Sequence, residues 1–160
     1  MYARDTARLA TPIGTVELTG ADAALERVRI GVEGAPARPA SPALAAAVEQ
    51  LERFFAGELR LFDLPLAPAA TSRGAALRAA IVAIGYGETL AYGDIARRIA
   101  SSARAVGQAC ARNPFPLVVP CHRVLAAGGR LGPYSAGDGP ATKRWLLEHE
   151  RGWAGGGLLL

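Results

Sequence analysis

The chain has 160 residues, of which 51% are hydrophobic and 20% charged, and this composition predicts a globular protein rather than a disordered one. No apolar run approaches the roughly 20 residues that a membrane-spanning helix needs, and residues 1–10 lack the apolar core of a secretory signal, so we expect a cytoplasmic protein with no membrane partner. The net charge of +4 is uneven: residues 1–69 hold seven Arg and nine Asp or Glu, whereas residues 70–160 hold eleven Lys or Arg and five Asp or Glu. A basic C-terminal half either faces a polyanion such as nucleic acid or is simply a solvated surface.

The N-terminal part of the chain predicts short strands followed by a helix. Apolar and polar residues alternate over 15–19 and again over 28–32, which is the period of half-buried strands. Ser41 and Pro42 supply an N-cap and a first-turn proline for a helix that Gly57 ends. The face of this helix that we expect to be buried consists of Leu44, Val48, Leu51 and Phe55.

A proline-containing stretch over 63–70 indicates a linker, after which the sequence becomes mainly helical. One predicted helix places Leu77, Ile81 and Ile84 on one face, and a second does the same with Tyr92, Ile95 and Ile99. Ser101-Ser102 can cap a third helix, and a last helix is expected over about 141–150. The second and third helices form a helix-turn-helix candidate, although many helical hairpins bind nothing.

The predicted fold class is therefore α/β, of the α+β kind, in two lobes. Residues 1–69 form a small N-terminal lobe with a sheet and a helix, and residues 70–160 form a mainly helical lobe that carries the helix-turn-helix element and the candidate active site.

Cysteine usage points to reactive chemistry at one position. Cys110 and Cys121 are too few for a disulfide scaffold, and the two histidines lie far apart in the sequence, so we predict no metal site. A nucleophilic cysteine needs a nearby base, and His122 directly follows Cys121, with Glu148 and Glu150 as carboxylates that could orient it. A bare Cys-His pair is nevertheless more often a buried structural cysteine beside an incidental histidine.

The other cysteine, Cys110, follows Val106 by four residues and should share its buried helix face. We expect this thiol to be inert, the alternative being that it lies near Cys121 and forms a disulfide under oxidation.

The longer string NPFPLVVPCHRV, from Asn113 to Val124, closely resembles the active-site signature of the O6-alkylguanine-DNA alkyltransferases. The resemblance covers nearly the whole chain, strongly from Ile84 onward. Further segments similar to the family are TPIG (11–14), YGET (86–89), YGDIA (92–96), ARAVG (103–107), YS (134–135) and KRWLLEHE (143–150).

This resemblance implies DNA repair by irreversible, single-turnover transfer of an alkyl group from O6-alkylguanine, with O4-alkylthymine as a further possible lesion, to Cys121 after base flipping. His122 would deprotonate Cys121 through a water, and Glu150 would hold His122. Tyr92 would act on the guanine ring and the adjacent phosphate, and Asn113 would support the turn before the active-site segment. The family needs no organic cofactor, and since residues 1–100 contain no Cys or His, we expect no zinc site either.

The resemblance also implies the DNA-contacting and pocket residues. Arg104 would enter the stack where the target base has left. The expected DNA-binding residues are Arg104, Tyr92, Ala103, Ala105, Gly107 and Arg123. The expected substrate-pocket residues are Val124, Tyr134, Ser135 and Lys143. The expected partner is double-stranded DNA containing O6-alkylguanine, bound by a monomer.

The sequence departs from the family pattern in spacing: the interval from Tyr92 to Arg104 is about two residues shorter than usual, and the loop from Tyr134 to Lys143 about two longer. Three alternatives remain open. They are a non-catalytic alkyltransferase-like protein that binds lesions without repairing them, a cysteine hydrolase, for which no oxyanion hole is evident, and a helix-turn-helix regulator.

Overall fold

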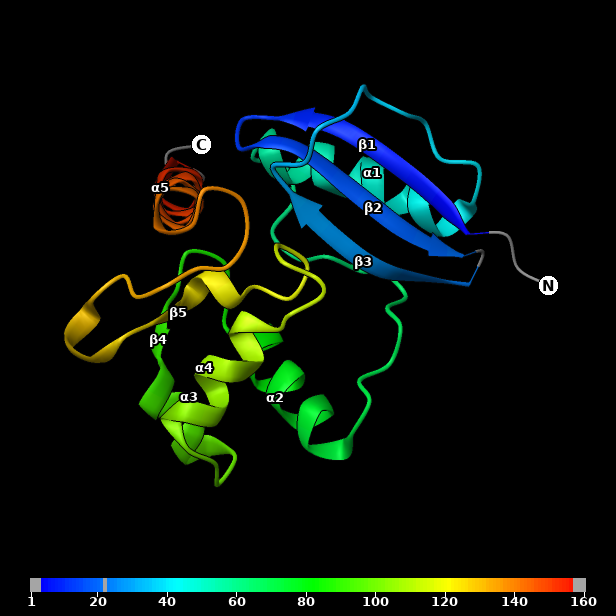
Figure 1. The fold of residues 1–160 in the computed structure, drawn as a ribbon. Coiled ribbons are helices and arrows are strands. Elements are labelled where there is room, and N and C mark those ends of the chain that lie inside the picture. Colours follow the sequence, from blue (N-terminus) through cyan, green and yellow to red (C-terminus); the bar gives the residue numbers. More distant parts are fainter. Residues whose placement is uncertain (1–3, 22, 157–160) are drawn as a thin grey trace. The chain divides into compact units, whose positions relative to one another are not determined.

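The structure is a computed structural model that describes residues 4–21 and 23–156. The chain forms two compact units, one ending at Ala67 and the other beginning at Pro68 (Figure 1). The change of unit falls within the proline-containing stretch over 63–70. In the described part of the chain, none of the helices has the length and apolar character needed to cross a bilayer.

The first unit is an antiparallel three-stranded sheet covered on one face by a helix. Strands β1 (Asp5–Thr11), β2 (Gly14–Ala21) and β3 (Ala24–Ile30) lie in the order β1-β2-β3, and α1 (Pro42–Phe55) packs against all three. The inward-facing strand residues are Ala7, Leu9, Val16, Leu18, Leu25, Val28 and Ile30. Burial of this apolar face against α1 is what holds the unit together.

Strand β3 begins earlier than the alternation over 28–32 predicts. Thr19 pairs with Arg27 and Gly20 with Leu25, so Glu26 is an extra residue at a β-bulge. The bulge turns both Leu25 and Val28 inward although they are three residues apart. This odd spacing hides the first half of the strand from a search for period-two alternation.

Helix α1 starts where its capping residues predict. The Ser41 side chain accepts a hydrogen bond from the Leu44 N–H at 3.4 Å, and Asp5 Oδ2 accepts from the Ser41 N–H at 2.6 Å, which ties the helix start to β1. The buried stripe contains Leu44 and Leu51 as expected, but Ala47 and Phe54 are fully buried while Val48 and Phe55 are only partly so.

The second unit is mainly helical and carries the candidate active site. Its elements, in chain order, are α2 (Ser72–Val82), β4 (Leu90–Ala91), α3 (Tyr92–Arg98), α4 (Ala103–Ala111), the 3-10 turn η1 (Cys121–Arg123), β5 (Val124–Leu125), the 3-10 turn η2 (Ala127–Gly129) and α5 (Pro140–Gly156). Helix α5 continues six residues past the predicted end at Glu150.

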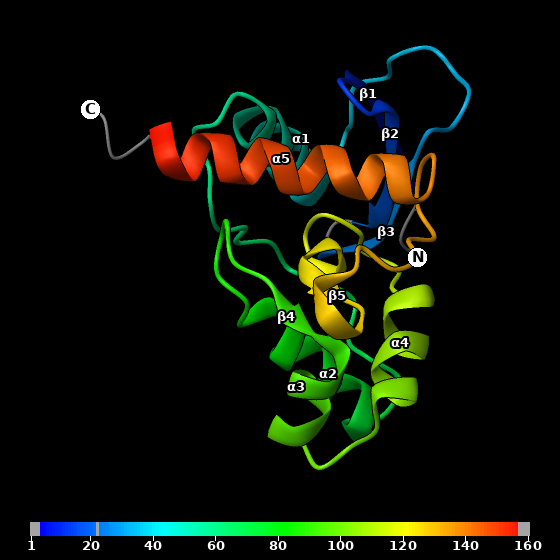
Figure 2. The ribbon, with the colours of Figure 1, turned by 90° about the vertical axis from the view of Figure 1, so that its left-hand side faces the viewer.

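Helices α3 and α4 form the predicted helix-turn-helix pair, and Figure 2 shows the short turn that joins them. Ser102 is the N-cap of α4, since its hydroxyl accepts from the Ala105 N–H at 3.1 Å. The shortened turn closes with Ala100 at a φ of 52°, a left-handed conformation that is unfavourable for a non-glycine residue. Val106 and Cys110 are both buried, as the helical spacing predicts.

The short parallel pair of β4 and β5 brings distant parts of this unit together. Leu90 pairs with Val124 and Ala91 with Leu125. Tyr92 follows β4 and Cys121 lies three residues before β5, so this pairing carries the first residue of α3 to the segment that holds the cysteine.

Candidate active site

Cys121 is held in a buried turn by the segment that precedes it. The run from Phe115 to Pro120 is buried, with Leu117 at a φ of 79°. Asn113 fastens both ends of this turn: its Nδ2 donates to the Val119 carbonyl at 2.9 Å and to Cys121 Sγ at 3.1 Å, and its Oδ1 accepts from the Phe115 N–H at 2.9 Å. The left-handed Leu117 and the Asn113 contacts together fix where the sulfur lies.

Cys121 lines a small cavity of about 120 Å³ within this unit. Tyr134 and Ser135, which the family resemblance implies as pocket residues, line it too, and so does Tyr92. The other lining residues are Gly107, Cys110, Ala111 and Pro133. The volume lies below the roughly 300–1,000 Å³ typical of pockets for drug-sized ligands, so the cavity suits a single small group or ring.

The cavity wall from α4 could have been found from the sequence. Cys110 and Ala111 lie three and four residues after Gly107, spacings that place both on the same helix face as Gly107. Cys110 is thus buried, as expected, and also faces the cavity that holds Cys121.

The ionisable groups of the cavity are neutral at rest. Burial raises the pKa of the Cys121 thiol, and the Asn113 hydrogen bond and the Lys143 charge only partly oppose this effect. Burial also raises the pKa of Cys110 to about 12 and that of Tyr92 to about 12. Cys121 therefore needs a base to lose its proton, and Tyr92 keeps its hydroxyl proton for donation.

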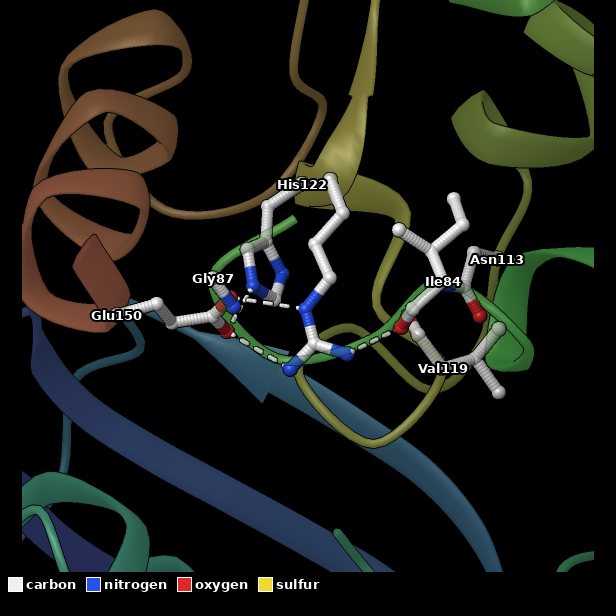
Figure 3. A network of polar contacts seen from close by, with 7 residues as sticks. Ile84, Gly87, Asn113, Val119, His122 and Glu150 are labelled. Carbon is white, nitrogen blue, oxygen red and sulfur yellow. Dashed lines mark hydrogen bonds and ion pairs between the residues drawn. The ribbon is translucent and has the colours of Figure 1, made fainter. Parts of the chain in front are cut away.

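His122, the candidate for this base, is part of a buried polar network (Figure 3). His122 Nε2 lies 2.6 Å from Glu150 Oε2, and both side chains are at most 1% exposed. His122 Nδ1 has no hydrogen-bond partner among the described residues. Of the two carboxylates considered from the sequence, the structure places Glu150 on the histidine, while Glu148 is exposed.

Arg123 belongs to the same network, which corrects its expected role in DNA binding. Its Nε donates to Glu150 Oε1 at 2.8 Å, its Nη2 to Glu150 Oε2 at 3.0 Å and its Nη1 to the Ile84 carbonyl at 2.7 Å. The side chain is 6% exposed, so its guanidinium is directed at protein groups rather than at a DNA phosphate. A bidentate pair with a buried carboxylate explains this inward orientation.

Gly87 adds a fourth donor to Glu150, through its N–H at 3.3 Å from Oε1. Its φ is 77°, and a Cβ there would lie 2.9 Å from the Ala154 Cβ on α5. The glycine of the YGET segment is therefore required both by the backbone conformation and by the close approach of α5.

Lys143 and Val124 lie behind the cavity wall rather than in it. The Lys143 side chain is fully buried, and its Nζ donates to the Val124 carbonyl at 2.7 Å and to the Pro133 carbonyl at 3.3 Å. Lys143 thus joins β5 to the loop that carries Tyr134 and Ser135, and it supports the pocket without lining it.

The remaining predicted DNA-binding residues lie at the start of α4. Ala103 and Arg104 are exposed and Ala105 is half-buried, whereas Gly107 faces the cavity. A Cβ added at Gly107 would meet no atom within 4 Å, so the fold itself does not require glycine there. Glycine inside a helix costs about 1 kcal/mol relative to alanine, so the free fold alone gives no reason for glycine at this position.

Comparison with known proteins places these residues in a family. Residues 75–152 match the DNA-binding domain of 6-O-methylguanine DNA methyltransferase. The chain is 41% identical over 157 residues to the methylated-DNA–protein-cysteine methyltransferase of Mycobacterium tuberculosis H37Rv, covering 94% of each protein. It is 43% identical over 113 residues to the constitutive enzyme of that name from Bacillus subtilis, covering 69% of this chain and 68% of that protein.

Solved structures agree with the sequence comparison. The crystal structure of Mycobacterium tuberculosis OGT in complex with DNA matches with a TM-score of 0.81 and 39% identity, covering 92% of this chain and 93% of that one. The O6-methylguanine methyltransferase structure from the same organism matches with a TM-score of 0.79 and 37% identity over 94% of each chain.

Proposed function

Because the chain belongs to the methylated-DNA–protein-cysteine methyltransferase family, we propose that it repairs DNA by moving an alkyl group from O6-alkylguanine to its own Cys121. The observation that carries this proposal is a cavity lined by Cys121, whose next residue in the chain, His122, is paired with the buried carboxylate of Glu150. O4-alkylthymine is the alternative lesion that the same displacement would repair.

The proposed reaction is a single displacement. The thiol proton leaves for His122 Nδ1, directly or through a water, and His122 Nε2 stays on Glu150. The sulfur electron pair forms the new carbon–sulfur bond while the carbon–oxygen bond breaks, and the guanine ring takes up the electron pair and then a proton. Asn113 Nδ2, 3.1 Å from Sγ, stabilises charge that develops on the sulfur, and Tyr92 keeps its proton available to the departing ring.

The target base must leave the duplex to reach this cavity, because Cys121 is only 4% exposed. Unstacking and unpairing a base costs a few kcal/mol. Gly107 lets the base or its backbone come close to α4, and Arg104, exposed at the helix start, fills the vacated space. Ala103 and Ala105 keep the same helix end narrow enough to approach a DNA groove.

The proposed chemistry bears on the cellular location and the oligomeric state of the protein. A reaction that consumes a thiol requires Cys121 to be reduced, and both cysteines are free, which favours a cytoplasmic location. The nucleophile, its base and the helix-turn-helix pair all belong to one unit of one chain, so a monomer is sufficient.

The stoichiometry of transfer tests the proposed function. With excess duplex DNA containing O6-methylguanine, we expect each chain to gain one methyl group in place of one hydrogen, located on Cys121, and then to stop reacting. Intact-mass and peptide mass spectrometry measure this result. Repeated turnover by each chain would contradict the suicide mechanism, and tight lesion binding without any mass gain would identify a lesion-binding protein instead.

Replacing Arg104 with Ala tests the base-flipping step. We expect Arg104→Ala to slow repair of duplex DNA about tenfold or more, because part of the flipping cost is no longer offset, and to leave the reaction with free O6-benzylguanine nearly unchanged. Arg112→Ala is the matched control, since Arg112 is exposed at the other end of α4 and carries the same charge. Equal losses on duplex and free base for Arg104→Ala would make Arg104 a folding residue.

A further inference from the structure

The Arg123 guanidinium is fully engaged inside the protein. Each of its three nitrogens donates a hydrogen bond, two to the Glu150 carboxylate and one to the carbonyl of Ile84, two residues past the end of α2. Its central carbon also lies 5.7 Å from the centre of the Tyr86 ring. Arg123 therefore connects three separate segments around one buried carboxylate (Figure 3).

Charge balance in this network depends on the state of His122. Arg123 contributes one positive charge and Glu150 one negative charge, and both are buried. With a neutral imidazole the three side chains carry no net charge, whereas an imidazolium would leave an uncompensated buried positive charge, which is strongly unfavourable. The same geometry assigns the tautomer: the Nε2 nitrogen that faces Glu150 carries the proton, and Nδ1 keeps its lone pair.

We propose that Arg123 is a positioning residue for alkyl transfer, which by binding both oxygens of Glu150 keeps His122 neutral, with Nδ1 free to accept the proton from Cys121. This inference rests on the proposed function and deepens it. Without Arg123 the full charge of Glu150 would act on the imidazole alone and stabilise the imidazolium. The base would then take up a proton from solvent at a higher pH than in the wild type.

Of the other charged groups around His122, Lys143 acts in the same direction as Arg123 and Glu150 acts against it. Glu150 and Lys143 face His122 from α5, and Arg123 and the neutral Cys121 flank it in η1. Burial is the largest effect and lowers the pKa of His122, Glu150 opposes it, and the positive charges of Arg123 and Lys143 add to the lowering. Among these groups, Arg123 is the cation hydrogen-bonded to the partner of His122.

The test is a pH titration of the imidazole nitrogens by 15N NMR, with His149 in the same spectra for comparison. In the wild-type protein we expect His122 to remain neutral in the Nε2–H form at neutral pH. In Arg123→Gln we expect its imidazolium to form at a pH higher by about one unit or more, since a nearby charge shifts a pKa by about that amount. The acid limb of the rate profile with free O6-benzylguanine should move by the same amount.

Arg123→Lys is the second variant, because it retains the charge and loses the two-pronged contact. We expect its His122 titration to lie between those of the wild type and Arg123→Gln, because the positive charge stays near Glu150 while the contact with both oxygens is lost. The wild-type tautomer can be measured even where Arg123→Gln does not fold, and an Nδ1–H form there would overturn the proposal. An unchanged titration in Arg123→Gln would make Arg123 purely structural. A salt dependence of DNA binding that weakens in Arg123→Gln by the equivalent of about one phosphate contact would return Arg123 to the DNA interface. The NMR results do not depend on alkyl transfer, so failure of the proposed function would appear separately, in the stoichiometry of the wild type.

Discussion

The Cys121→Ser variant is expected to acquire no alkyl group while it still folds and binds duplex DNA. A serine hydroxyl is a far weaker nucleophile than a thiol, and His122 alone does not compensate for the difference. The substitution leaves a side chain of similar shape that can still accept from Asn113 Nδ2, so the turn around η1 should keep its conformation. Intact-mass spectrometry after incubation with O6-methylguanine DNA, together with a binding isotherm, measures both parts of this expectation.

Cys110→Ala is the matched control, because Cys110 lines the same cavity and is also a buried thiol. We expect this variant to gain one methyl group on Cys121, as the wild type does, since burial raises the pKa of Cys110 to about 12 and no base adjoins it in the sequence. A methyl group found on any residue of Cys121→Ser, or missing from a folded Cys110→Ala, would show that the single-nucleophile assignment is wrong.

Local sequence patterns were sufficient to predict much of the fold. Ser41 and Ser102 cap α1 and α4 as expected, and Leu77 and Ile81 of α2 are buried. Ile84 is buried too, although it lies just past the end of α2. These predictions succeed because capping and helical periodicity depend on residues within a few positions of one another.

The errors occurred where a distant contact decides the outcome. The bulge at Glu26 breaks the alternation in β3 because the pairing with β2 sets the register. Arg123 appeared to be a DNA contact because its partner, Glu150, is 27 residues away, and the sequence does not reveal that the side chain turns inward. Lys143 was expected in the pocket, and it lies instead behind the wall, where it donates to two backbone carbonyls.

Glu150→Gln is expected to destabilise the fold and slow transfer together. The substitution leaves the Arg123 guanidinium buried without its counter-charge, and removing one member of a buried ion pair typically costs about 3–5 kcal/mol. It also takes the anionic partner from His122 Nε2, so the imidazole is less well oriented and the imidazolium formed during transfer is less stable. Thermal or denaturant unfolding and the rate with free O6-benzylguanine measure the two effects.

Two controls separate the unpaired charge from the lost orientation of His122. Glu148→Gln changes an exposed carboxylate on the same helix and should alter stability by less than about 0.5 kcal/mol. The double variant Arg123→Met with Glu150→Gln removes both charges and should recover part of the lost stability but not the lost rate. Recovery of the rate in the double variant would mean that Glu150 does not act on His122 during transfer.

The pH dependence of stability should show that the ionised carboxylate of Glu150 accounts for the stability lost in Glu150→Gln. Burial raises its pKa, but the hydrogen bonds from His122 and Arg123 and the positive charge of Arg123 outweigh this effect and lower the pKa from 4.5 to about 2. A carboxylate with a depressed pKa in the folded state stabilises the fold fully above its unfolded pKa, and this stabilisation is lost as the pH falls through the folded value. The wild type should therefore lose its advantage over Glu150→Gln as the pH falls from about 4.5 toward 2. Because the glutamine cannot ionise, a free-energy difference between the two proteins that stays constant across this range would show that Glu150 is not held as a carboxylate in the folded protein.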